Sequence, residues 1–89
     1  MTLFEVLDKV RKSSGCYLVN AWTKKYDNGT TLCEYKVVET KRHRTPIVFV
    51  QVGYYNDTKE VIGATMYKPG DEANLVCLVW NNNYFLQEV

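Results

Sequence analysis

The densest group of chemically active side chains in the chain is the run Lys41, Arg42, His43 and Arg44. A proline and the apolar stretch 47–52 follow it, so we expect the run to form a loop. Cations held close together raise the local electrostatic potential, which favours a phosphate group or an acidic protein surface as the partner. A basic loop also keeps a sheet edge soluble, so the run fits either a binding or a solvating role.

Catalysis by a nucleophile needs a serine, threonine or cysteine beside a base, and His43 is the only histidine. No residue near His43 in the sequence marks a nucleophile. Paired acids for acid–base chemistry could come only from distant positions that the fold brings together. The candidates are Glu34, Glu39, Glu60 and Asp71. The glycines are isolated and leave no glycine-rich phosphate loop, so we expect a protein that is not an enzyme.

The three cysteines, Cys16, Cys33 and Cys77, lack the paired spacing of a zinc site. Their odd number argues against a disulfide framework, so we expect buried free thiols. We expect no metal ion and no other cofactor. Gly53 and Gly63 lie inside strand-like segments, where glycine indicates a bulge or close packing.

Aromatic side chains are numerous, with seven tyrosines, two tryptophans and three phenylalanines. Such side chains are favoured at interfaces because they combine a large apolar area with few rotatable bonds. We expect some of them on the surface, with Trp22, Tyr54 or Tyr55, Tyr67 and Tyr84 as candidates. The residues predicted to bind a partner are Trp22, Lys36, Lys41, Arg42, His43, Arg44 and Tyr67.

These side chains need a scaffold, and the sequence predicts a helix over 3–13. Thr2 and Glu5 have the spacing of a capping box, and Gly15 suits a left-handed helix cap. Acidic residues lie early and basic residues late, as the helix dipole favours. Apolar residues recur every three or four positions and form one stripe of Leu3, Val6, Leu7 and Val10.

A β-hairpin is expected next, with strands over 16–26 and 30–40 around the turn 27–29. A three-residue turn with Gly29 as a bulge gives one apolar face and one polar face. The resulting pairs are Val19 with Val37 and Ala21 with Tyr35. The apolar face consists of Tyr17, Val19, Ala21, Cys33, Tyr35 and Val37, and the other face consists of Leu18, Asn20, Trp22, Lys24, Glu34 and Lys36.

Further strands are expected over 47–55, 60–67 and 74–80, with 84–88 as a short sixth strand or an ordered tail. The strand 47–55 is apolar on both faces, so we expect it at the centre of the sheet, with the helix covering one side. The sequence thus predicts an α+β fold in a single domain over 1–89. One N-terminal helix packs on an antiparallel meander of five to six strands.

The net charge of +1 hides an asymmetry, because residues 1–45 hold nine Lys or Arg against five Asp or Glu, while residues 46–89 hold two against five. Domains that bind nucleic acid through phosphate contacts usually carry a stronger basic excess. No apolar stretch reaches the roughly 20 residues of a membrane helix, and no secretory signal is recognisable. We therefore expect a cytoplasmic protein without membrane contact.

From these features we expect a small non-enzymatic intracellular protein-binding module. A phage or other mobile element often encodes such a domain, for instance to inhibit a host nuclease or defence complex. The alternative is a nucleic-acid-binding domain that uses the basic loop, with Lys24, Lys25 and Lys36 and neighbouring aromatic residues. A homodimer is a further alternative, in which two copies pair through an exposed edge strand. The candidate edges are the strand of Asn20 and Trp22 and the C-terminal strand.

Overall fold

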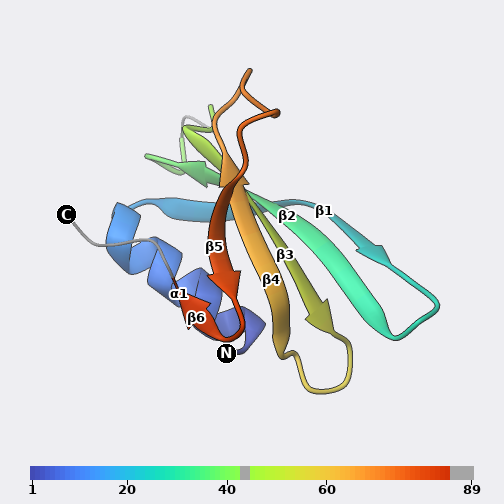
Figure 1. Ribbon diagram of the computed structural model, residues 1–89. Coiled ribbons are helices and arrows are strands. Elements are labelled where there is room, and N and C mark those ends of the chain that lie inside the picture. The colour runs from blue at the N-terminus through green and yellow to red at the C-terminus, as the bar shows by residue number, and fades with distance from the viewer. Residues whose placement is uncertain (43–44, 85–89) are drawn as a thin grey trace.

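The computed structural model describes residues 1–42 and 45–84, and it confirms the predicted α+β fold with one helix on an antiparallel six-stranded meander (Figure 1). The helix α1 spans Leu3–Ser14. The strands, whose spatial order follows the chain, are β1 (Tyr17–Lys25), β2 (Thr30–Val38), β3 (Val48–Tyr55), β4 (Val61–Tyr67), β5 (Val76–Trp80) and β6 (Asn83–Tyr84). The edges are therefore β1 and β6, and residues 85–88 of the predicted sixth strand lie outside the described residues.

Both ends of α1 have the caps that the sequence predicts. The Thr2 hydroxyl accepts a hydrogen bond from the Glu5 amide (3.4 Å), and the Glu5 carboxylate accepts one from the Thr2 amide (3.3 Å). Gly15 closes the helix with φ 67°, a left-handed conformation that glycine adopts without steric cost. The helix begins and ends where its sequence directs it to.

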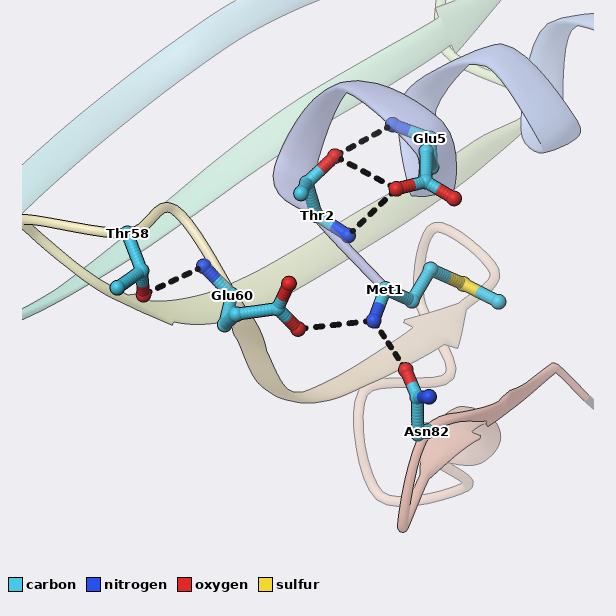
Figure 2. A network of polar contacts seen from close by, with 6 residues as sticks. All are labelled: Met1, Thr2, Glu5, Thr58, Glu60 and Asn82. Atoms are coloured by element: carbon cyan, nitrogen blue, oxygen red, sulfur yellow. Dashed lines mark hydrogen bonds and ion pairs between the residues drawn. The ribbon is translucent and has the colours of Figure 1, made fainter.

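The start of α1 is fixed to the sheet by the polar contacts in Figure 2. The Met1 amino group donates to the Glu60 carboxylate at 2.9 Å and to the Asn82 side-chain carbonyl. Thr2 forms an isolated β-bridge with Glu60, and the Val61 amide donates to the Met1 carbonyl at 2.8 Å. These contacts bind the beginning of the helix to the start of β4 and to the turn before β6.

The core lies between α1 and one face of the sheet. From the helix it takes the predicted stripe of Leu3, Val6, Leu7 and Val10. From the sheet it takes Cys33, Val37, Val50, Val52, Tyr54, Ala64, Leu78 and Val79. Each fully buried valine or leucine of this kind stabilises the fold by about 1.5–3 kcal/mol. The strand β3 lies between β2 and β4, which agrees with the central position expected for it.

The turn of the first hairpin follows the prediction. The amide of Tyr26 donates to the carbonyl of Thr30 at 2.9 Å, which leaves residues 27–29 as a three-residue turn. Gly29 has φ 85°, a value that favours glycine. Next to the turn, β1 and β2 therefore pair in the expected register.

Beyond the turn, the register of β1 differs from the prediction because Ala21 forms a β-bulge. A bulge inserts one extra residue and moves the following side chains to the opposite faces. Leu18 therefore pairs with Val37 and packs on the core, while Tyr17 is 46% exposed. Two predicted pairs are wrong, Val19 with Val37 and Ala21 with Tyr35. Tyr17, Val19 and Ala21 do not form the core face of this strand.

The bulge predicts an order of stabilities for two neighbouring variants. Leu18→Ala should lower the free energy of unfolding by about 1.5 kcal/mol, because Leu18 is half-buried against the core. Tyr17→Ala should lower it by about 0.5 kcal/mol, as is usual for a surface position. Urea denaturation of both variants measures this difference. A larger loss for Tyr17→Ala would contradict the bulged register and support the straight one.

Candidate binding site on the uncovered sheet face

The face of the sheet opposite α1 has no helix or strand over it in the part of the chain that the structure describes (Figure 1). We call it the open face. The pairing of the strands brings onto it Trp22 and Lys24 from β1, Leu32, Glu34 and Lys36 from β2, Phe49, Gln51 and Gly53 from β3, Gly63, Thr65 and Tyr67 from β4, and Cys77 and Trp80 from β5. The open face thus combines aromatic, polar and charged side chains.

A carboxylate near the middle of the open face joins four strands. Glu34 of β2 accepts hydrogen bonds from Trp22 Nε1 (2.9 Å, to Oε2), from Gln51 Nε2 (3.1 Å, to Oε1) and from the Tyr67 hydroxyl (to Oε1). The donors come from β1, β3 and β4. Strand pairing places Trp22 and Gln51 on either side of Glu34. Phe49 stacks on Tyr67 with ring centroids 5.0 Å apart, so the aromatic rings are held on both sides of the carboxylate.

The Glu34 residue is only 6% exposed although it lies on the uncovered face, because its three donors surround it. All three donors are neutral groups. Within residues 1–42 and 45–84, no lysine or arginine nitrogen lies within 4.0 Å of this carboxylate. The hydrogen bond to Glu34, followed by burial, raises the pKa of Tyr67 to about 12. The Tyr67 hydroxyl therefore remains a donor across the physiological pH range.

Next to this network the open face is hollowed. A cavity of about 390 Å³ lies over the paired glycines Gly53 and Gly63. Its walls include Leu32, Cys77 and Trp80. The Trp80 residue is 58% exposed, although aromatic side chains of this size are normally well covered. The result is an apolar hollow with an exposed indole at its rim.

The two glycines are not required by the backbone. A Cβ atom at Gly53 would meet its nearest neighbour at 3.9 Å, and one at Gly63 would lie 3.6 Å from the Val79 carbonyl oxygen. Both distances are ordinary van der Waals contacts, and neither glycine has a positive φ. The sequence predicts a bulge or close packing here, and the register does shift after Gly53. Because glycine has no side chain, the space above these two positions remains unfilled and forms the hollow.

Three of the predicted binding residues, Trp22, Lys36 and Tyr67, lie together on the open face. Trp22 and Tyr67 contact the same carboxylate from two different strands. Lys36 lies two residues from it along β2 and is partly buried. Two others, His43 and Arg44, lie outside the described residues.

The remaining predicted cations do not join this group. Lys41 and Arg42 follow β2, whereas Lys24 and Lys25 precede the turn at its other end. The nine residues of β2 separate the two pairs by about 30 Å. The ammonium of Lys41 lies 5.2 Å from the ring centroid of Tyr17. Lys24 and Lys25 are therefore far from the described part of the basic loop, whereas Lys36 lies near the end of β2 that leads into it.

The exposure of single residues also differs from what the sequence indicates. Of the adjacent tyrosines, Tyr55 is exposed and Tyr54 is 9% exposed within the core. Cys33 is a buried free thiol as predicted, but Cys77 is exposed on the open face and Cys16 is half-buried. Of the four acidic candidates, Glu60 contacts Met1, Asp71 contacts Asn74, and Glu39 is exposed in the loop after β2. None of these three is a partner of Glu34, whose hydrogen bonds come from Trp22, Gln51 and Tyr67.

Sequence reasoning did not single out Gln51 or Trp80. Gln51 could have been found from register, since it pairs with Glu34 in β2 and with Thr65 in β4. Trp80 ends an apolar strand, and nothing in the sequence says that its ring remains uncovered. Its ring lies over Gly63, whose added Cβ would be 3.8 Å from the ring. A glycine paired with a tryptophan is the available signal.

Comparison of the chain with protein-family models, with the curated proteins and with the solved structures finds no match. Among the described residues, no group of three histidine, cysteine, aspartate or glutamate side chains could hold a metal ion. No helix in the same ranges is long and apolar enough to span a membrane.

Replacing Glu34 should change how Tyr67 ionises. In Glu34→Gln, the pKa of Tyr67 should fall from about 12 towards its ordinary value of 10.0, because the anionic acceptor is lost. In the wild type, the Tyr67–Glu34 hydrogen bond stabilises the fold fully below pH 10, and this stabilisation is lost as the pH rises through about 12. Nuclear magnetic resonance (NMR) of ring-labelled tyrosine, assigned with Tyr67→Phe, follows the titration. An unchanged Tyr67 titration in Glu34→Gln would contradict the contact.

Proposed function

We propose that this chain is a protein-binding module whose interface is the open face of the sheet. The observation that carries the proposal is the apolar hollow over Gly53 and Gly63, with the half-exposed indole of Trp80 at its rim. Antiparallel sheets that leave one face in water normally cover that face with polar side chains. An uncovered face with a hollow and large aromatic residues is instead typical of an interaction site.

A protein partner fits the hollow better than a free small molecule. At about 390 Å³ the hollow is near the lower limit of ligand sites, which enclose most of their ligand. A small molecule bound in a hollow on a sheet face would keep one side in water. A side chain that belongs to a larger protein surface would not, because that surface covers the rim of the hollow. The polar residues Thr30, Gln51 and Thr65 also line the hollow. An apolar centre with a polar rim is the usual composition of a protein–protein interface.

Nucleic acid is the weaker candidate on the described geometry. Lys24 and Lys25 lie at the turn end of β2, whereas Lys36, Lys41 and Arg42 lie at its other end or beyond it, so the described cations do not make one continuous basic track. The ammonium of Lys24 is directed to the ring of Tyr26, at 5.2 Å from its centroid. An inhibitor of a host nuclease or defence complex, as expected from the sequence, is one kind of module that binds through such a face. The identity of the partner that the experiment below captures tests whether this module is such an inhibitor.

The open face can be tested with two variants that leave the core intact. Trp80→Ala should weaken the partner's binding about thirtyfold, the loss of about 2 kcal/mol that is typical of a hot spot. Gly53→Val should also weaken binding, because its methyl groups project into the hollow while its Cβ meets no atom closer than 3.9 Å. The partner is captured from lysate treated with nuclease, identified and purified. Its affinity is then measured by calorimetry.

Phe4→Ala is the matched control. Phe4 is 66% exposed on α1, so the variant removes an exposed aromatic ring from the other side of the molecule. Its affinity for the partner should equal that of the wild type, and thermal unfolding should show all three variants folded. Equal affinity of Trp80→Ala and Gly53→Val with the wild type would overturn the proposal. Capture that is abolished by nuclease would favour a nucleic-acid partner instead.

A further inference from the structure

The Glu34 carboxylate carries a charge that the described residues do not neutralise. Its three hydrogen-bond donors, Trp22, Gln51 and Tyr67, are all neutral. Neutral donors satisfy a buried carboxylate geometrically but leave its negative charge uncompensated. Most proteins pair a carboxylate that is 94% covered with a cation. Near its middle, the open face therefore holds a covered carboxylate that forms no ion pair with the described residues, although Lys36 lies two residues away on the same strand.

The two oxygens of Glu34 are not equally occupied. Oε1 accepts two hydrogen bonds, from Gln51 and from Tyr67, whereas Oε2 accepts one, from Trp22. A carboxylate oxygen has two acceptor positions, so Oε2 has one remaining. This position adjoins the indole of Trp22, which is 38% exposed. Since the Glu34 residue is itself 6% exposed, an additional donor has to reach Oε2 beside this partly exposed indole.

The chain's own lysines on the open face do not fill this position. Lys24 directs its ammonium to Tyr26, and Lys36 keeps its ammonium more than 4.0 Å from the carboxylate. An indole face attracts a cation through its quadrupole, and a planar guanidinium can stack on it while donating to a carboxylate at its edge. A flexible ammonium lacks this combination of stacking and directed hydrogen bonds.

On the premise that the open face binds a protein, we propose that Glu34 and Trp22 together form the receptor for an arginine side chain of that partner. The guanidinium donates to Oε2 of Glu34 and stacks on the indole of Trp22. Gln51 and Tyr67 hold the carboxylate in place from the other two strands. The hollow over Gly53 and Gly63 then receives an apolar side chain of the same partner. An arginine beside an apolar anchor is thus the expected recognition pattern.

The receptor can be probed without knowing the partner. N-acetyl-arginine amide is titrated into the nitrogen-labelled protein, and the indole N–H resonances of Trp22 and Trp80 are followed by NMR. The Trp22 resonance, assigned with Trp22→Phe, should shift with saturation at probe concentrations on the order of 10 mM. Trp80, at the rim of the hollow, is the internal reference and should shift less. N-acetyl-citrulline amide has the same shape without the charge and should leave both resonances unchanged.

Two variants with equal charge changes complete the test. Glu34→Gln should weaken the arginine probe at least fivefold, whereas Glu39→Gln, in the exposed loop after β2, should have no effect. Equal shifts of Trp22 with the arginine and citrulline probes would overturn the proposal, and so would equal losses in the two variants. The comparison of the two probes uses the wild-type chain, so it decides even if Glu34→Gln does not fold.

The test of the arginine receptor and the test of the open face as the interface can give independent results. If the arginine probe fails but Trp80→Ala and Gly53→Val weaken the partner, the open face is the interface and Glu34 is not an arginine receptor. If the probe binds Trp22 but neither variant affects the partner, the partner binds elsewhere. In that case the premise fails, although the receptor exists.

Discussion

A single helix has to cover a six-stranded sheet, and this mismatch determines the rest of the molecule. The 12 residues of α1 make a rod of about 18 Å, while six strands span about 24 Å across the sheet. The helix is sufficient for one face, where its apolar stripe meets the buried sides of β2 to β5. In the described part of the chain no second helix or strand covers the opposite face. The side chains of that face therefore remain in contact with water unless they cover one another.

On the open face, which no helix or strand covers, the side chains form a hydrogen-bonded network around Glu34 rather than a uniformly polar surface. Glu34 lies under donors from three strands, which fixes the rotamers of Trp22 and Tyr67 and holds the neighbouring strands in register. No buried side-chain nitrogen or oxygen of the described residues lacks a hydrogen-bond partner. A surface with its aromatic rings already fixed loses little conformational entropy on binding, which favours affinity. The hollow over Gly53 and Gly63 lies beside this preorganised region.

The local features of the fold could be predicted from the sequence, and the features that need several strands at once could not. The capping box at Thr2 and the hairpin turn with Gly29 at positive φ depend on neighbours within a few residues, so the residue types are sufficient to predict them. The bulge at Ala21 has no glycine or proline to mark it and is favoured because it brings Leu18 to the core. The convergence on Glu34 requires the registers of four strands, which residue type alone does not specify.

The most direct test of the open face as the interface uses the chain's own cysteines. The alkylation rates of Cys77 and Cys16 are measured by mass spectrometry with and without the bound partner. Cys77 is exposed on the open face and Cys16 lies at the end of α1 against the core. Burial raises the pKa of Cys33 to about 11, so this thiol should stay unreactive. The partner should slow alkylation of Cys77 at least tenfold and leave Cys16 unchanged. Unchanged alkylation of Cys77 in the complex would contradict an interface on the open face.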